Sequence, residues 1–296
     1  MKLIKGLVLA ATLFANQSLA NTIDLGAASN YNVFVFGDYK SNSWNTISGA
    51  VAVGKNANIS TSTIKNSANN PYGLVVGGDL TKSYDNVTSK TWVGGNVTKP
   101  EWDSYNNYST AASSPIDFVA AKAQLTSLSD NLASTASTGS VNYAFGTNGY
   151  LAGSGSSIEY FSLAGTDLSN INNWSFSNIA SGATLILNVS GSSVNLTGGW
   201  SGFGAYNVLF NFYDATSLTL NNIDFTASIL AVDAKLNGAS GKVNGTVVVN
   251  EWNNSLTLGN SQFAAVTPVP EPHSYALLIM GLLVVLGFRR AKRAAL

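Results

Sequence analysis

VAVGKN at Val51–Asn56, LVVGGD at Leu74–Asp79 and TWVGGN at Thr91–Asn96 are three versions of one motif. Each is a short apolar run that ends in glycine and an Asx residue, a pattern typical of a strand followed by a tight turn. The first glycines of successive motifs lie 23 and 17 residues apart. Repetition at about 20 residues favours a β-solenoid, because each coil buries its apolar face only by stacking on the next coil.

A second series of apolar runs occupies the C-terminal half. Its members are Leu185–Asn188, Val208–Asn211, Ser228–Ala231 and Val247–Asn250, at spacings of 23, 20 and 19 residues. Three of the four runs end in asparagine, which indicates either an inward ladder of hydrogen-bonded side chains or solvated turns. Together the two series predict a mainly β fold, a parallel β-solenoid. An antiparallel sandwich, which also spaces its strands regularly, is the alternative.

One segment between the two series has a helical pattern. We expect a helix over about 115–137, with Ser114 as its cap, Pro115 at the first helical position and Asp117 completing a capping box. Gly139 is the expected stop. The helix carries one narrow apolar stripe, made of Phe118, Ala121, Leu125, Leu128 and Leu132. A stripe of this kind predicts one long α-helix packed alongside the solenoid.

Charge is segregated along the chain. The 296 residues carry 15 Lys and Arg against 15 Asp and Glu, yet residues 21–267 hold 9 Lys, no Arg and 14 Asp and Glu, a formal balance of −5. The absence of Cys excludes disulfides, thiolate metal sites and Cys nucleophiles. The one histidine, His273, falls outside this body, which therefore lacks the usual general base and the commonest metal ligand. We expect no enzyme activity, no catalytic residue, no cofactor, no metal site and no nucleic-acid partner.

Carboxylate chemistry is the enzymatic alternative that this composition leaves open. Asp79, Asp85, Glu101 and Asp103 lie in one Gly- and Asn-rich region. A carbohydrate-active enzyme could use such a set, because glycoside hydrolysis needs only two suitably placed carboxyl groups. The usual role of such residues in a solenoid is a solvated turn.

Aromatic residues gather in the same region. Residues 92–108 interleave Trp92, Trp102, Tyr105 and Tyr108 with amide and carboxylate side chains. Flat apolar faces beside directional polar groups suit sugar rings or protein surfaces, so these four residues form a candidate ligand surface. Packing against the solenoid is the other interpretation. Ice binding would require regular Thr-x-Thr rows, and Thr61–Thr63 stands almost alone.

Both ends of the chain have the pattern of targeting signals. Residues 1–20 have a cationic start with Lys2 and Lys5, continue as an apolar stretch and carry small residues at the third-last and last positions, Ser18 and Ala20. This pattern predicts a signal peptide cut by signal peptidase between Ala20 and Asn21. Residues 275–288 form an apolar run, expected to be a separate C-terminal hydrophobic helix. Fourteen helical residues span roughly 21 Å, short of the roughly 30 Å hydrocarbon core, so this transmembrane helix suits a transient stay in the membrane.

The residues around this run complete a three-part signal. It is preceded by Pro270, Glu271 and Pro272 and followed by a basic stop, which consists of Arg289, Arg290, Lys292 and Arg293. The arrangement over 268–296 closely resembles the PEP-CTERM sorting signal of Gram-negative bacteria. The resemblance implies a transient stage in the inner membrane, removal of the helix and tail by an exosortase, and transfer to the cell surface, outer envelope or extracellular matrix.

The body, residues 21–267, also resembles a known domain. The residues that carry the resemblance are IDLGAASNYNVFVFGDY at Ile23–Tyr39, Val51–Gly54, Phe118, Leu125, Asn188–Gly191, Leu209–Phe212 and Ile229–Ala231. In this order they are similar to the choice-of-anchor A domain of bacterial surface proteins. The resemblance implies an adhesive module with an ice-binding-like β-helix and supplies no catalytic residues. We therefore expect an adhesin or a structural component of a biofilm or floc matrix, with extracellular polysaccharide or surface proteins as partners; a carbohydrate-binding or carboxylate-based carbohydrate-active protein is the alternative.

Overall fold

The computed structural model describes residues 22–41, 43–67, 70–105, 107–109, 113–144 and 147–267. The predicted signal peptide, sorting motif, hydrophobic helix and basic stop lie outside these residues. None of the helices in the described ranges has the length and apolar character that a membrane crossing requires. The chain divides into Asp24–Ala265 and a unit of the two terminal segments, in which Ile23 and Val266 exchange backbone hydrogen bonds of 2.8 and 3.0 Å.

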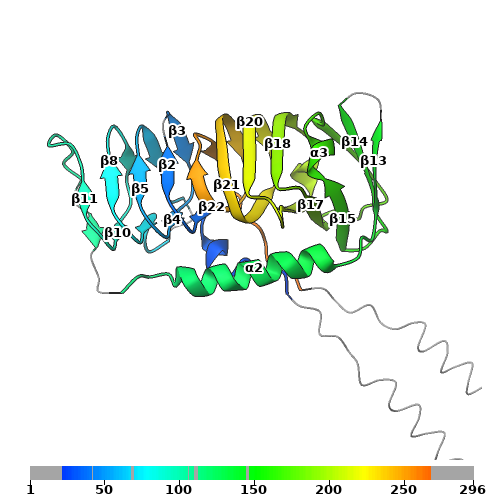
Figure 1. Ribbon diagram of the computed structural model, residues 1–296, viewed down its shortest axis with the longest axis horizontal. Coiled ribbons are helices and arrows are strands. Elements are labelled where there is room, and N and C mark those ends of the chain that lie inside the picture. The colour runs from blue at the N-terminus through cyan, green and yellow to red at the C-terminus, as the bar shows by residue number, and fades with distance from the viewer. Residues whose placement is uncertain are drawn as a thin grey trace, which may run out of the picture. The chain divides into compact units, whose positions relative to one another are not determined.

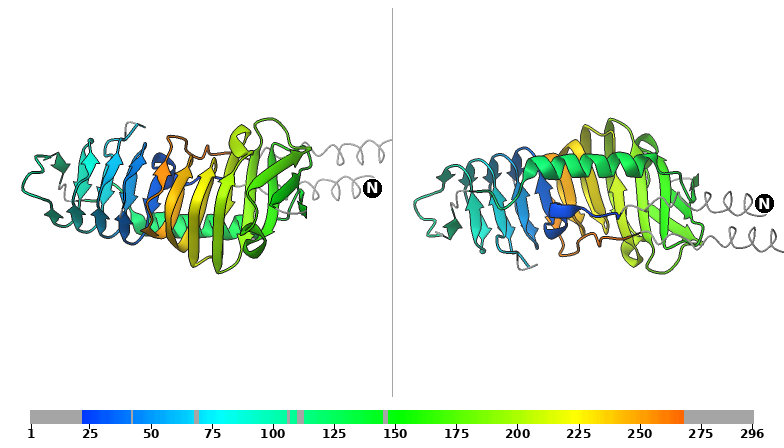
Figure 2. Two further views of the ribbon diagram at one scale, coloured as in Figure 1. Left: turned by 90° about the horizontal axis from the view of Figure 1, so that it is seen from above. Right: turned by 90° about the horizontal axis from the view of Figure 1, so that it is seen from below.

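Asp24–Ala265 is built mainly from short parallel strands in three ladders (Figures 1 and 2). In each coil the chain passes through the three ladders in turn. In spatial order, the first ladder contains β12 (Tyr108–Ser109), β10 (Thr91–Val93), β7 (Leu74–Val76), β4 (Val51–Val53), β1 (Val33–Val35), β22 (Val247–Asn253), β21 (Ser228–Val243), β19 (Asn207–Asn211), β17 (Thr184–Ser190) and β15 (Ile158–Ala164). The predicted parallel β-solenoid is therefore confirmed.

The other two ladders complete the coils. The second contains β11 (Val97–Thr98), β8 (Leu80–Lys82), β5 (Ala57–Ile59), β2 (Tyr39–Ser41), the end of β22, the middle of β21, and the first parts of β20 (Ser217–Phe225) and β18 (Ser193–Trp200). The third contains β9 (Asn86–Val87), β6 (Ser62–Ile64), β3 (Asn45–Ile47), β23 (Thr257–Leu258) and the ends of β21, β20 and β18.

The coils are not stacked in chain order. Val33 of β1 pairs with Val51 of β4 on one side and with Val247 of β22 on the other. The N-terminal coils stack outward from β1 to β12, and the chain then returns as α2 (Phe118–Ser134) to the opposite end of the stack (Figure 1). From β15 onward the coils stack back until β22 closes on β1. The seam between the two series thus lies in the middle of the unit.

Rows of aligned apolar side chains form the core. The row on the first ladder contains Phe161, Leu187, Phe210, Ile229, Val247, Val33, Val51 and Leu74, each fully buried. Burial of one such side chain contributes about 1.5–3 kcal/mol relative to exposure. The apolar runs of the sequence are therefore the stacked core positions of successive coils.

Glycine is required where the N-terminal coils turn from the first ladder to the second. A Cβ on Gly77 would clash with the carbonyl oxygen of Gly54, and one on Gly94 would clash with that of Gly77. The backbones of neighbouring coils approach too closely here for any side chain. This close approach explains why the motif repeats its glycine.

The Asx residue of the motif links one coil to the next. Oδ1 of Asp38 accepts from the amide of Asn56 at 3.0 Å, and Oδ1 of Asn56 accepts from the amide of Asp79 at 2.9 Å. Oδ1 of Asp79 in turn accepts from the amide of Asn96 at 2.7 Å. Side chains of one coil thus satisfy turn amides of the next coil, which no strand pairing reaches.

Gly77→Ala should lower the free energy of unfolding by about 1–3 kcal/mol, because the new methyl group forces the carbonyl of Gly54 to move. Urea unfolding of the two proteins measures the difference. Gly204→Ala is the matched control, since a Cβ there meets nothing within 4 Å. Equal losses in the two variants would contradict a steric role for the stacked glycines.

The long helix is shorter than predicted at both ends. Its N-cap is Asp117, whose Oδ1 accepts from the amides of Val119 and Ala120 at 3.1 and 2.9 Å. Ser114 does not cap it, because its hydroxyl is bonded locally to Ile116. The predicted stop was also wrong: the helix ends at Ser134, and Gly139 is needed instead because a Cβ there would clash with the ring of Phe161.

Beneath α2, two asparagines form the ladder that the sequence suggested, but not inside the coil. Asn211 donates to Oδ1 of Asn188 and to the carbonyl oxygen of Ser129, both at 2.9 Å, while Asn188 donates to that of Leu132 at 2.7 Å. Both asparagines are buried and anchor the helix to the first ladder. Of the predicted stripe, Ala121, Leu125 and Leu132 are buried, and Phe118 and Leu128 are half-buried.

The end of the solenoid at β15 carries elements that the sequence did not predict. β13 (Ser140–Ala144) and β14 (Asn148–Ala152) form an antiparallel hairpin, and β14 pairs in parallel with β16 (Asn173–Ser177). The short helix α3 (Gly165–Leu168) and the 3-10 turns η1 (Gly26–Asn30) and η2 (Phe203–Ala205) complete the unit. Trp174 of β16 packs on Trp200 and Phe203, with ring centroids 5.6 and 5.8 Å apart.

Candidate functional site

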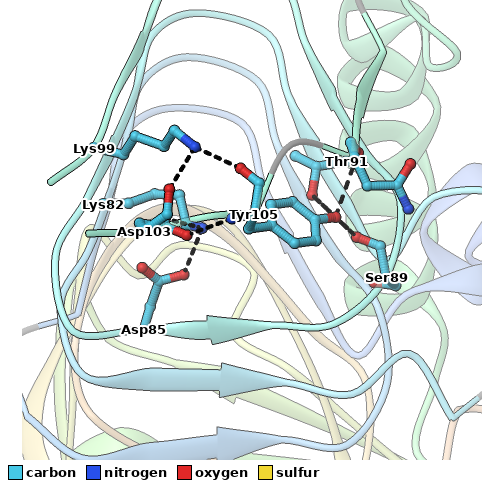
Figure 3. A network of polar contacts seen from close by, with 8 residues as sticks. Lys82, Asp85, Ser89, Thr91, Lys99, Asp103 and Tyr105 are labelled. Atoms are coloured by element: carbon cyan, nitrogen blue, oxygen red, sulfur yellow. Dashed lines mark hydrogen bonds and ion pairs between the residues drawn. The ribbon is translucent and has the colours of Figure 1, made fainter. Parts of the chain in front are cut away.

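The crossing segment, residues 99–105 after β11, folds across the last N-terminal coil and covers a buried charge (Figure 3). Lys82, at the end of β8, is 4% exposed. Its Nζ lies 2.9 Å from Oδ2 of Asp103 and 3.3 Å from Oδ2 of Asp85. Asp103 comes from the segment that crosses the coil, so this ion pair joins the segment to the solenoid.

Two tyrosines and a second lysine surround the buried ammonium. Nζ of Lys82 lies 4.7 Å from the ring centroid of Tyr105 and 5.8 Å from that of Tyr108, within cation–π range. The two rings meet edge to face at 5.2 Å. Lys99 donates to the carbonyl oxygens of Asp103 and Tyr105, both at 2.7 Å, and the Tyr105 hydroxyl donates to the carbonyl oxygen of Ser89. These contacts hold the crossing segment in place.

Burial and pairing have opposite effects on these charges. Burial disfavours the charged form of Lys82, but the hydrogen bond to Asp103 and the charge of Asp85 outweigh it and raise the pKa of Lys82. Burial likewise opposes ionisation of Asp103, yet hydrogen bonds from Lys82 and the Tyr105 amide lower its pKa. Burial raises the pKa of Asp85. Lys82 and Asp103 therefore form the ionised pair, and Asp85 is the carboxylate that protonates first.

The four residues of the candidate ligand surface come to this end of the solenoid but not to one face. Trp92 is buried on the first ladder, in register with Val75 of the next coil. Tyr105 and Tyr108 are half-buried beside Lys82. Trp102 alone of the four is well exposed, and its ring stacks on that of a residue the sequence had not singled out.

That residue is Tyr84, at the turn from the second ladder to the third. The rings of Tyr84 and Trp102 are stacked with centroids 5.4 Å apart and an interplanar angle of 27°. The two side chains are 66% and 60% exposed, so their outer faces are open to solvent. The coil repeat was the signal that could have found Tyr84, since Trp102 follows it by one coil.

The candidate carboxylates do not converge on a common cleft. Asp79 belongs to the Asx ladder at the glycine corner, Asp85 and Asp103 contact Lys82, and Glu101 is exposed. Among the described residues, no group of three or more His, Cys, Asp and Glu side chains is placed to hold a metal ion. Three of the four carboxylates thus have structural partners.

The chain is similar to one known family, to a known sorting motif and to two solved structures. A family model described as "Putative Ice-binding-like adhesive domain" matches residues 24–263, and a PEP-CTERM protein-sorting motif matches residues 268–293. No curated protein matches the chain. An ice-binding protein from an Arctic yeast is 16% identical with a TM-score of 0.33, over 87% of this chain and 99% of that chain. An ice-binding protein from an Antarctic biological consortium is 14% identical with a TM-score of 0.28, over 85% of this chain and 95% of that chain.

Proposed function

Because this chain belongs to the family of ice-binding-like adhesive domains, we propose that it acts as an adhesin or structural component of a biofilm or floc matrix in a Gram-negative bacterium. One observation carries the proposal: the adhesive domain ends at residue 263 and the sorting motif begins at residue 268. An adhesive body directly followed by an exosortase signal indicates a protein exported to the cell envelope or surface. Its role there is the proposed step.

The chemistry of the body supports a binding or structural role. Residues 21–267 contain no Arg, Cys or His, so catalytic triads that need His and phosphoryl transfer that needs an Arg clamp have no residues to use. Stability comes from stacked coils rather than from disulfides. A parallel solenoid of this kind presents long straight edges, which suit contact with extended polymers or with neighbouring cells.

The proposed route has two processing steps. Signal peptidase cuts between Ala20 and Asn21, and an exosortase cuts near Pro270–Pro272 after a transient stage in the inner membrane through residues 275–288. Both steps remove a cationic end. The mature body that remains carries a formal charge close to −5.

Deleting the exosortase gene should leave the chain in the membrane fraction with its C-terminus intact, because nothing then removes residues 275–288. Intact-mass measurement of the extracellular and membrane-bound protein tests this. A variant with Pro270, Glu271 and Pro272 replaced by Ala should behave in the same way. Extracellular protein with an unchanged C-terminus in the exosortase deletion strain would rule out the sorting route. Normal flocculation in a strain that lacks the gene of the protein itself would rule out the matrix role.

Carbohydrate binding is the second candidate function, favoured by the exposed rings of Tyr84 and Trp102. A carbohydrate-active enzyme that uses carboxylates has less support than carbohydrate binding alone, because Asp85 and Asp103 are both paired with Lys82. Retention on a glycan without turnover indicates binding, whereas release of reducing ends indicates an enzyme.

A further inference from the structure

Three exposed aromatic side chains lie at the same corner of the solenoid, between the second and third ladders. Trp44 is 78% exposed, and Tyr84 and Trp102 are 66% and 60% exposed. Every other Trp in the described residues is buried. Single exposed apolar side chains are common on protein surfaces, whereas several large aromatic rings exposed at neighbouring positions indicate an interaction site.

Strand register places these side chains in one line. Asn45 pairs with Ser62 and Thr63 pairs with Asn86 on the third ladder. Extended back by one or two residues, the same register aligns Trp44 with Thr61 and Thr61 with Tyr84, on three successive coils. Trp102 extends the line by one coil, because its ring stacks on Tyr84. We call Trp44, Thr61, Tyr84 and Trp102 the aromatic edge.

The line runs parallel to the solenoid axis. Adjacent strands in a sheet lie about 4.8 Å apart, so Trp44 and Tyr84, two coils apart, are separated by roughly 10 Å along the edge. Tyr84 and Trp102 have ring centroids 5.4 Å apart. The edge therefore offers aromatic faces at more than one point along a straight track, which suits an extended polymer better than a small compact ligand.

The surroundings of the edge indicate which polymer. The side chains that accompany its aromatic rings are short and carry hydroxyl groups: Thr61 within the edge, and Ser43, Ser60 and Ser83 directly before its members. Two lysines lie beside Tyr84 and Trp102: Lys82 is buried and paired with Asp103, and Lys99 donates to the carbonyl oxygens of Asp103 and Tyr105. The exposed charge next to Trp102 is that of Glu101. A nucleic acid or acidic polysaccharide needs exposed cations, which this arrangement does not supply.

We propose that the aromatic edge binds a neutral polysaccharide chain laid along the solenoid axis. The apolar faces of sugar rings stack on Trp44, Tyr84 and Trp102, and sugar hydroxyls exchange hydrogen bonds with the flanking Ser and Thr side chains. Successive coils add successive contacts, so affinity rises with chain length. The inference rests on the proposed surface or matrix function and identifies the class of polymer that the protein would hold.

Affinity electrophoresis of the secreted, processed protein tests the edge. Native gels contain hydroxyethylcellulose, mixed-linkage β-glucan or galactomannan as neutral polymers, and alginate as an acidic one. At least one neutral polymer should retard the protein. Trp44→Ala, Tyr84→Ala and Trp102→Ala should each weaken the retardation about tenfold, since a stacked aromatic residue is typically a binding hot spot. The Trp44→Ala, Trp102→Ala double variant should migrate as in a gel without polymer.

Tyr150→Ala and Tyr213→Ala are the matched controls, because these tyrosines are 42% and 39% exposed and lie in the other half of the chain. Both should be retarded like the unaltered protein, and circular dichroism should be native for every variant. The inference is overturned by migration unaffected by all three neutral polymers, by retardation in alginate alone, or by equal losses in the control variants.

A parallel flocculation assay separates this inference from the proposed function. If gene deletion abolishes flocculation but the edge variants are retarded normally, the matrix role stands and the edge is wrong. If deletion leaves flocculation unchanged while the edge variants lose retardation, the edge stands and the matrix role is wrong.

Discussion

Lys82→Met should lower the free energy of unfolding by about 3–5 kcal/mol, because it removes the cation that the buried side chain of Asp85 and the partly exposed one of Asp103 share. The side chains of Lys82 and Asp85 are each 2% exposed, so water cannot replace the lost partner. The crossing segment should loosen first, since Asp103 is its ionic link to the solenoid. Urea unfolding at neutral pH, followed by tryptophan fluorescence, measures the loss.

Lys122→Met is the matched control for this prediction. Lys122 pairs with Asp233 at 3.0 Å, but the two side chains are 40% and 64% exposed. Exposed pairs of this kind contribute about 0–1 kcal/mol, so the control should be nearly neutral. A second test combines Lys82→Met with Asp85→Leu and Asp103→Leu, which should recover much of the loss because no unpaired charge then remains. If Lys82→Met were as mild as the control, the buried triad would not hold this end together.

Glu159→Gln should destabilise the opposite end by roughly 2–4 kcal/mol, because charge-assisted hydrogen bonds become neutral ones. Glu159 is fully buried at the start of β15. Its Oε1 accepts from the successive amides of Ser154, Gly155 and Ser156 at 2.7, 2.9 and 2.9 Å, and its Oε2 accepts from the Thr138 hydroxyl at 2.5 Å. Chemical denaturation at pH 7 measures the effect.

The same carboxylate predicts a pH dependence. Burial opposes ionisation of Glu159, but hydrogen bonds from Thr138 and from the Ser154 and Ser156 amides outweigh it, so its pKa lies below the ordinary value. Its contribution is therefore present above the pKa of the unfolded chain, about 4.3, and is lost as pH falls through the lower folded pKa. Glu159→Gln should lack this part of the acid sensitivity. Glu251→Gln, at a 43% exposed side chain paired with Lys235, should keep it and change stability by less than about 1 kcal/mol.

Neither buried carboxylate cluster was predictable as such. Asp85 and Asp103 were recognised only as members of an acidic, aromatic region, and Glu159 had no pattern around it. Their roles depend on partners 21 residues away for Lys82 with Asp103 and for Thr138 with Glu159. Sequence spacing does not tell whether such a partner faces the same side, because that depends on how each turn is folded.

The candidate ligand surface shows the same limit. Trp102 was grouped with Trp92, Tyr105 and Tyr108, but the ring on which it stacks belongs to Tyr84. Trp44 lines up with these two rings only through coil register. The sequence grouped residues by proximity along the chain, which placed the buried Trp92 in the set. In a solenoid, surface neighbours are one coil apart, so proximity along the chain is a poor guide to a shared face.

The sequence by itself determined the apolar core runs, the glycine turns of the N-terminal coils and the presence of a terminal sorting motif. Apolar runs, glycine with Asx, and the terminal motif are local patterns, and local backbone geometry is enough to interpret them. Only the tertiary structure decided the order of the coils, with β1 held between β4 and β22 and α2 spanning the seam. The reason is that all coils present similar apolar edges, so a repeat specifies that coils stack but not which coil stacks on which. That choice follows from burying every edge at once, including the two ends that Lys82 and Glu159 help to close.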